Sequence, residues 1–230
     1  MNDALQMLRT MVELQEAHNI QVAPDWRSRG LPFQRAIWVE CAELLDHFGW
    51  KWWKRQTPDL GQVKLELVDI WHFGLSQLMQ EGRTGAEEAA RLAAVLTQTA
   101  AASSMALPAP ADATDDATDD AEAFRASVES LALAALRTGT FAVAEFAQVM
   151  QGLRMDLREL FELYVGKNVL NRFRQDHGYL AGDYRKTWAG REDNAHLLEI
   201  VGGIDPARTD YTVALYAQLR QRYESTAAGA

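Results

Sequence analysis

Two pairs of carboxylates with the same spacing stand out in this chain. Glu40 and Glu43 lie in the segment WVECAELLDHF, and Glu66 and Asp69 lie in VKLELVDIWHF. Residues three apart lie on one face of an α-helix, so the members of each pair repel each other unless a positive charge lies between them. Four converging carboxylates form an all-oxygen site of the kind that Mg²⁺ or Mn²⁺ prefers. The spacing therefore indicates a metal-dependent enzyme that acts on a phosphorylated substrate.

A second segment, from Gly166 to Asn194, is rich in cations in an otherwise acidic chain. Between Gly166 and Arg191, six lysines and arginines accompany only two aspartates, whereas the whole chain has a net charge of −9. Cations opposite metal-held carboxylates suit a polyphosphate, because the metal neutralises one set of phosphate oxygens and the cations neutralise the others. Asparagine amides in the same segment supply donors and acceptors for a sugar or a base. On charge counting alone, a solvated loop whose charges screen one another remains the alternative.

The sequence WKWWK (residues 50–54) follows the first acidic pair. Three tryptophans in four positions cannot all lie on one side of a helix, so we expect at least one of them to stack on a base. Lys51 or Lys54 is then within reach of phosphate. The alternative is core packing and an interface anchor, and we expect two of the three tryptophans to be structural.

Helical periodicity recurs along the chain and strand alternation is nearly absent. Pro32 is placed to open one helix that ends at Gly49, and the next helix starts near Asp59. The short connection between these two helices favours an antiparallel pair, which brings the two acidic pairs opposite each other. The expected helices span residues 5–15, 32–48, 59–81, 124–137, 141–151, 155–165 and 211–223.

The composition predicts one globular all-α domain, residues 1–230, with a flexible insertion. With 230 residues, of which 48% are hydrophobic, the chain can bury a substantial core. Residues 98–120 are rich in Ala, Ser, Pro, Thr and Asp and end in DATDDATDD, which indicates a solvated acidic linker. A calcium loop is disfavoured there because its glycine and terminal glutamate are missing. Cys41 is the single cysteine, which excludes a disulfide framework, and we expect it to be buried and structural.

Several classes of protein are disfavoured by charge and hydropathy. A net charge of −9 argues against a protein that coats nucleic acid or binds a membrane surface. The N-terminal sequence lacks the pattern of a signal peptide, and no apolar stretch approaches the ~20 residues of a membrane span. We therefore expect a cytoplasmic protein that has neither nucleic acid nor membrane as a partner.

Three stretches together resemble the dimeric, all-α dUTP diphosphatases (dimeric dUTPases): ECAELLDHFGWKWWK, ELVDIWHF and GKNVLNRFRQDHGYLAGDYRKTWAGREDN. These enzymes belong to the helical nucleoside triphosphate pyrophosphohydrolases, which include the MazG proteins. The paired acids are a superfamily motif, whereas the third stretch marks the dUTPase branch. The resemblance runs from about residue 5 to 79 and again from about residue 124, and the segment 98–120 has no counterpart.

The resemblance implies a helical bundle of the all-α NTP pyrophosphohydrolase type, with a low-complexity acidic insertion. It implies a Mg²⁺-dependent homodimer that hydrolyses dUTP to dUMP and pyrophosphate, and dUDP to dUMP and phosphate. Such an enzyme removes dUTP from the nucleotide pool and supplies the precursor of dTMP.

Functional residues carry over position by position from the same motifs. Glu40, Glu43, Glu66 and Asp69 match the metal ligands, and Glu43 or Glu40 is the expected catalytic base. Gln15 and Asn19 match contacts to uracil or sugar, while His18 stands where the family usually has leucine. The other expected substrate contacts are Trp50, Trp52, Trp53 and Lys54 on the base side, with Lys54 reaching phosphate, and Lys167, Asn168, Asn171, Arg174, Tyr179, Lys186 and Asn194 for phosphate and nucleotide.

Two alternatives remain open from the sequence. One is a pyrophosphohydrolase of the same fold that acts on another nucleotide, such as dCTP or a modified nucleotide. The other is a non-catalytic helical dimerisation module whose acids are merely solvated. The apolar neighbours of Glu66 and Asp69 count against solvated acids.

Overall fold

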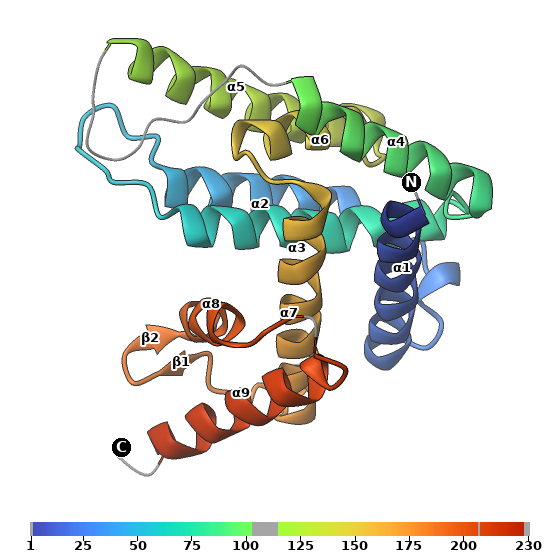
Figure 1. Cartoon of the computed structure of the whole chain (residues 1–230), viewed down its shortest axis with the longest axis vertical. Coiled ribbons are helices and arrows are strands. Elements are labelled where there is room, and N and C mark those ends of the chain that lie inside the picture. Colours follow the sequence, from blue (N-terminus) through green and yellow to red (C-terminus); the bar gives the residue numbers. More distant parts are fainter. Residues whose placement is uncertain (1, 103–114, 207, 228–230) are drawn as a thin grey trace. The chain divides into compact units, whose positions relative to one another are not determined.

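The computed structural model describes residues 2–102, 115–206 and 208–227 (Figure 1). Its regular structure is almost entirely helical, which confirms the all-α prediction. The chain divides into two compact units, Met1–Phe161 and Glu162–Ala230. In chain order the helices are α1 (Asn2–Val22), η1 (Trp26–Ser28), α2 (Phe33–Phe48), α3 (Leu60–Gln80), α4 (Ala86–Ala102), α5 (Asp115–Thr138), α6 (Val143–Gly152), α7 (Leu157–Asp176), η2 (Tyr179–Ala181), α8 (Asp193–Gly203) and α9 (Tyr211–Ala227).

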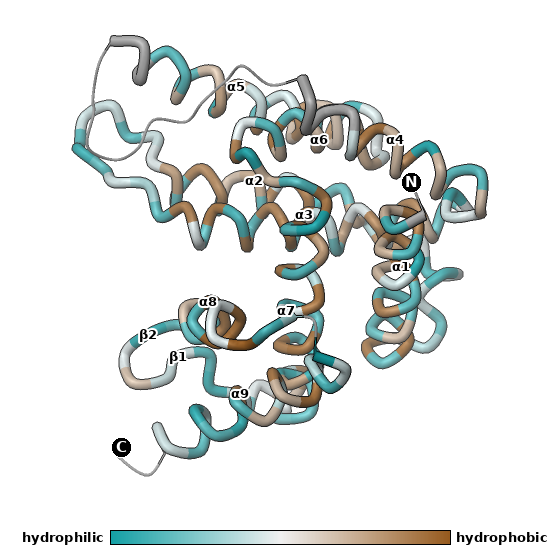
Figure 2. The backbone as a smooth tube through the Cα atoms, in the orientation of Figure 1, coloured by the Kyte–Doolittle hydropathy of each residue, from teal (hydrophilic) through white to brown (hydrophobic). Residues whose placement is uncertain are grey.

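The first unit is built around α2 and α3, which pack side by side (Figure 1). The buried residues of α2, Ile37, Cys41, Leu44 and Phe48, recur every three or four positions and form one apolar face. Hydrophobic and hydrophilic stretches accordingly alternate along both helices in Figure 2. After α2, Gly49 adopts a φ of +96°, a conformation that favours glycine.

The start of α3 is fixed by Asp59, whose carboxylate accepts a hydrogen bond from the Gln62 backbone N–H at 3.2 Å. Most of α3 is buried, because α1 packs on it as well as α2. The Trp71 ring stacks on the Phe146 ring of α6 with 5.1 Å between centroids. A Cβ atom at Gly74 would lie 2.6 Å from the Phe141 ring, so only glycine permits this close approach. This packing holds α3 firmly between its neighbours.

The second unit has an aromatic core. Phe173, on α7, lies within 6 Å of the rings of Trp188 and Tyr223, and the Tyr184 and Tyr223 rings stack at 5.5 Å. Trp188 belongs to a two-residue strand, β1 (Thr187–Trp188), which pairs antiparallel with β2 (Arg191–Glu192). The two-residue turn between them has positive φ at both positions, the geometry of a tight hairpin turn.

The observed helices differ from the expected ones mainly in the second half of the chain. The predicted helices at 32–48 and 59–81 correspond closely to α2 and α3. The helix predicted for residues 155–165 continues to residue 176 as α7, and neither α4 nor α8 was predicted. The expected insertion 98–120 begins within α4 and ends within α5, and residues 103–114 lie outside the described part of the chain. The single domain and the flexible insertion remain predictions.

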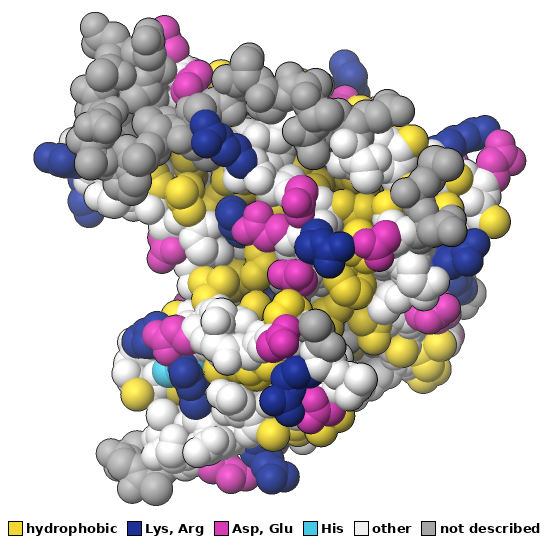
Figure 3. Space-filling model, in the orientation of Figure 1, with side chains coloured by type: hydrophobic (Ala, Val, Ile, Leu, Met, Phe, Trp, Pro, Cys, Tyr) yellow, Lys and Arg dark blue, Asp and Glu magenta, His cyan; other side chains and the backbone are white. Residues whose placement is uncertain are grey.

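The described surface carries charges of both signs. On the face shown in Figure 3, acidic and basic side chains are interspersed and do not separate into fields of one sign. Among the described helices, none is long and apolar enough to cross a membrane.

Candidate active site

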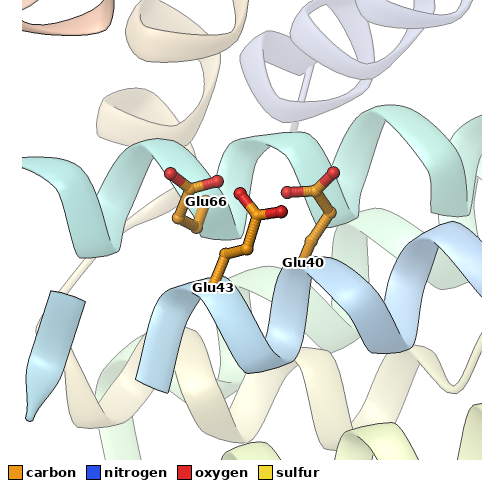
Figure 4. Close-up of side chains that lie close together, drawn as sticks. All are labelled: Glu40, Glu43 and Glu66. Carbon is orange, nitrogen blue, oxygen red and sulfur yellow. The ribbon is translucent and has the colours of Figure 1, made fainter. Parts of the chain in front are cut away.

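Three carboxylates converge where α2 and α3 lie side by side. Figure 4 shows Glu40 and Glu43 rising from α2 and Glu66 from α3, with their oxygens turned toward one another. One carboxylate oxygen from each lies within 4.8 Å of the others. Glu66 is buried, Glu40 is half-buried and Glu43 is exposed. The site is thus open on the Glu43 side and closed on the Glu66 side.

The electrostatics of this cluster fit a divalent cation. Burial, together with the charges of Asp69, Glu66 and Glu43, raises the pKa of Glu40 from 4.5 to about 9. Like charges held this close disfavour ionisation unless a cation neutralises them. The residues present therefore suit a hard divalent ion, which prefers oxygen ligands.

The fourth predicted ligand, Asp69, lies outside the group of three that meets within 4.8 Å. Its charge is nevertheless the second largest cause of the raised pKa of Glu40, after burial. Asp69 follows Glu66 by one helical turn on α3, so both carboxylates are on the side that faces Glu40. His47, which the sequence analysis did not identify, places Nε2 3.5 Å from Glu66 Oε1. His47 therefore adds an imidazole nitrogen beside the carboxylates.

Cys41 is buried as expected. Burial and the neighbouring Glu40 raise the pKa of its thiol to about 12. A thiol that stays protonated is a poor nucleophile, so Cys41 has the structural role that was predicted for it.

The amides expected to contact the base lie in a buried hydrogen-bonded group between α1 and α3. Gln15 Nε2 donates to Asn19 Oδ1 and to Ser76 Oγ, both at 3.0 Å. Asn19 Nδ2 also donates to Ser76 Oγ at 3.0 Å. The ring of His72 places Nδ1 2.7 Å from Gln15 Oε1. We call Gln15, Asn19, His72 and Ser76 the amide network.

The tryptophan segment is exposed, contrary to the expectation that two of its three tryptophans are structural. Trp50, Trp52 and Trp53 are 46%, 91% and 57% exposed. The segment lies in the loop between α2 and α3, where a connection was expected, and Gln56 Oε1 accepts the backbone N–H groups of Trp50 and Lys51. The rings contact each other edge to face at 5.2 and 5.6 Å between centroids. Aromatic faces are therefore available for stacking.

Lys54 lies in this same exposed loop. Its neighbour Lys51 instead forms an ion pair with Asp46, with 2.9 Å between Nζ and Oδ1. Of the two lysines considered as phosphate contacts, Lys51 is the one whose position is held by a carboxylate.

The cations predicted to bind phosphate lie in the second unit, where several of them share one polar network. Arg174 donates from Nε and Nη2 to the two carboxylate oxygens of Asp193, both at 2.8 Å. Its Nη1 donates to Asn171 Oδ1 at 3.1 Å. Tyr184 donates its hydroxyl to Asp193 Oδ2 at 2.8 Å. Burial tends to raise the pKa of Asp193, but the hydrogen bonds and charge of Arg174 lower it below its usual value.

Lys167 extends this network and overturns the solvated-loop alternative for its part of the chain. Its side chain is buried, and Nζ donates to Asn194 Oδ1 at 2.8 Å. Asn168 and Asn194 are buried as well. Buried polar groups of this kind are held by specific partners and are not freely solvated.

The remaining two predicted residues of this segment lie at the surface. Tyr179 is 50% exposed in η2. Lys186 is exposed, and its Nζ lies 3.5 Å from Glu192 Oε2. Surface pairs of this type are weak, so Lys186 can exchange Glu192 for a phosphate at little cost.

Some residues of these sites were missed because their partners are distant in sequence. His72 and Ser76 follow Asp69 by three and seven positions, a spacing that places them on the same helix face and that was available as a signal. Asp193 directly precedes Asn194, but nothing local indicates that it pairs with Arg174.

Comparison with known proteins agrees with this geometry. The model of a protein family described as dUTPase matches residues 7–179. That range includes the carboxylate cluster, the amide network and the first part of the cationic segment, and it leaves Lys186 and Asn194 outside. A comparison with curated proteins found no match. The chain belongs to the dUTPase family and is an enzyme that hydrolyses dUTP to dUMP.

Proposed function

We propose that this dUTPase is a Mg²⁺-dependent, cytoplasmic homodimer that also hydrolyses dUDP. The observation that carries the metal assignment is the convergence of Glu40, Glu43 and Glu66 within 4.8 Å, with the pKa of Glu40 raised to about 9. Mn²⁺ is a plausible substitute because it accepts the same oxygen ligands. Exposed apolar side chains on α1 and α2, among them Ile20, Val22 and Trp38, supply surface for self-association.

In this proposal the exposure of each carboxylate on α2 and α3 indicates its role. Glu40, Glu43, Glu66 and Asp69 hold the cation, and Glu43, which is exposed, also accepts the proton of the attacking water. When bound, the cation offsets charge on the phosphate oxygens and lowers the pKa of water. The water oxygen attacks the β-phosphorus in line, and the bond to the α-phosphate oxygen breaks, so that dUMP leaves.

The cationic segment supplies positive charge for the phosphates in this proposal, as its resemblance to the family motif implies. Lys167, Arg174 and Lys186 donate hydrogen bonds to phosphate oxygens, on which negative charge builds up during the reaction. Asn168, Asn171, Tyr179 and Asn194 orient the nucleotide. The exposed rings of Trp50, Trp52 and Trp53 give a stacking surface for the base, and Lys54 reaches phosphate.

The direct test measures release of pyrophosphate or phosphate from dUTP, dUDP, dCTP, dTTP and UTP at equal concentrations, with Mg²⁺ and with EDTA. Turnover of dUTP and dUDP that EDTA abolishes supports the proposal. Turnover that survives EDTA would remove the metal assignment, and inert dUDP would remove the second substrate. Light scattering after size-exclusion chromatography gives the oligomeric state.

The raised pKa of Glu40 predicts how the stability of the metal-free protein depends on pH. A carboxyl pKa that rises on folding, here from 4.5 to about 9, means that the folded state keeps a proton that the unfolded state releases. The stabilisation is complete below about 4.5 and is lost as pH rises toward 9. In EDTA, the melting temperature should therefore fall between pH 6 and 9, and Mg²⁺ should reduce that fall.

Glu40→Gln is the control for this pH dependence, because glutamine has the same shape and does not titrate. The variant in EDTA should lack the part of the fall that Glu40 causes. The melting temperature of each protein is measured in EDTA at a series of fixed pH values. If it depends on pH identically in the variant and the wild type, the assignment to Glu40 is wrong.

Truncation of Gln15 tests the base assignment. Gln15→Ala removes an amide that the proposal matches to the hydrogen-bonding edge of uracil. A site that forms hydrogen bonds with the edge of uracil penalises the different edge of cytosine. Loss of the amide should therefore lower the preference for dUTP over dCTP, measured as the ratio of the kcat/KM values, by about tenfold or more. If the preference for dUTP over dCTP, measured with both nucleotides on the same enzyme, is unaltered, Gln15 does not contact the base as proposed.

A further inference from the structure

Ser76 holds a central place in the amide network. Its hydroxyl oxygen accepts the N–H groups of Gln15 and Asn19, each at 3.0 Å. Its hydroxyl hydrogen has two acceptors in reach, the His72 carbonyl at 2.9 Å and Asn19 Oδ1 at 3.4 Å, and the shorter distance favours the carbonyl. The residue is 1% exposed, so water does not compete for these bonds. The serine lies on α3, whereas both amides lie on α1. It is therefore a fixed point against which two amides from another helix are oriented.

Because a hydroxyl has a single hydrogen to give, it favours one orientation of the two amides. With that hydrogen on the His72 carbonyl, Ser76 Oγ acts only as an acceptor, so the NH₂ ends of Gln15 and Asn19 must face it. Turning Gln15 alone would bring its oxygen to the place 3.0 Å from Asn19 Oδ1 that Nε2 now occupies. Turning Gln15 alone therefore sets two amide oxygens against each other. Turning both amides takes the hydroxyl hydrogen from the His72 carbonyl and leaves one amide oxygen against a lone pair of Ser76 Oγ, which is costly.

His72 favours the same orientation. Its Nδ1 lies 2.7 Å from Gln15 Oε1, so a hydrogen on Nδ1 completes the pattern and a reversed amide would lose it. Gln15 Oε1 is thus directed to His72 while Gln15 Nε2 is directed to Ser76. His72 and Ser76 thus favour the same orientation of Gln15. Of these two residues, Ser76 is the one that forms hydrogen bonds with both amides.

We propose that Ser76 is a positioning residue that makes the enzyme select uracil over cytosine, by preventing the amides of Gln15 and Asn19 from reversing. This inference rests on the proposed function, in which these amides contact the base. Uracil presents a protonated N3 beside a carbonyl, whereas cytosine presents an unprotonated N3 beside an amino group. An amide held in one orientation matches only one of these edges, and a reversed amide matches the other. Ser76 acts through Gln15 and Asn19 and does not itself contact the base.

The test compares kcat/KM for dUTP and dCTP in Ser76→Ala. Loss of the acceptor lets the amides reverse, so the ratio of the two kcat/KM values should fall by about tenfold, with activity on dCTP rising relative to dUTP. Ser76→Thr keeps a hydroxyl that can bond the same carbonyl and should retain most of the ratio. A purely structural role would lower kcat/KM for both nucleotides alike and leave the ratio unchanged.

Ser127→Ala is a matched control, because the Ser127 hydroxyl also bonds a carbonyl of its own helix, Phe124 O at 2.7 Å, but lies outside the amide network. Its ratio should equal that of the wild type. If Ser76→Ala does not fold, Ser76→Cys keeps the volume of the side chain with a weaker acceptor and should lower the ratio in the same direction.

The variants separate failure of this inference from failure of the proposed function. An unchanged ratio in the Ser76 variants, beside a lowered ratio in Gln15→Ala, would overturn the role of Ser76 and leave the base assignment in place. An unchanged ratio in Ser76→Ala, Gln15→Ala and Asn19→Ala alike would overturn the base assignment, and the role of Ser76 with it.

Discussion

Glu43→Gln is expected to lower kcat for dUTP by about 10²-fold or more. Glutamine keeps the size of the side chain but neither accepts a proton nor neutralises a cation, so general base and metal geometry fail together. The exposed position of Glu43 at the open side of the carboxylate cluster is what assigns it to the proton of water. Steady-state kinetics at saturating dUTP and Mg²⁺ measure the effect.

Glu129→Gln provides the matched control, since Glu129 is an exposed glutamate of α5 outside the cluster. It should leave kcat unchanged, and both variants should melt within a few degrees of the wild type. A Glu43→Gln enzyme with near wild-type kcat would remove Glu43 from the mechanism.

Asp193→Asn is expected to destabilise the protein by about 3 kcal/mol, because it leaves a largely buried guanidinium without its counter-charge. The side chain of Asp193 is fully buried and that of Arg174 is 13% exposed. Two charge-assisted hydrogen bonds at 2.8 Å join them. The free energy of unfolding from urea titration, followed by tryptophan fluorescence, measures the loss.

The chain contains the same ion pair in an exposed setting, which isolates the effect of burial. Arg208 donates to both oxygens of Asp210 at 2.8 Å, but about half of each side chain is exposed. Asp210→Asn should therefore cost less than about 1 kcal/mol. Equal losses in the two variants would show that burial of the Arg174 pair does not set its contribution.

The pairing of α2 with α3 was predictable because its signals are local. The apolar spacing along α2, Gly49 at its end and Asp59 at the start of α3 each act within a few residues, and together they determine where the helices begin and end. With a short connection between them, the approach of the two acidic pairs followed from connectivity.

The tryptophans show where local reasoning failed. The argument about helix faces was applied to residues 50–53 although they lie in the connection expected between two helices, where Gln56 holds the backbone in a loop. In a loop, side-chain direction is set by individual hydrogen bonds, such as that from Trp50 Nε1 to Asp46. Periodicity carries no information about such bonds.

The polar networks could not be predicted for a different reason. The bonds of Ser76 to Gln15 and Asn19 join positions about sixty residues apart, and the bond of Arg174 to Asp193 joins two helices across a hairpin. Resemblance identified Gln15 and Asn19 of the amide network, but neither His72 nor Ser76, and it identified Arg174 without Asp193. The pairing of Ser76 and Asp193 with these residues is visible only when the helices are packed.

Because α3 carries both Glu66 and Ser76, this helix fixes the distance between the carboxylate cluster and the amide network. Ten residues at 1.5 Å each set about 15 Å along the axis between the two positions. Inserting a single residue between them would turn one end of the helix by about 100° relative to the other. Glu66 and Ser76 could then not both face their present partners. Base preference is therefore expected to change by substitution within the amide network and not by insertion or deletion in α3.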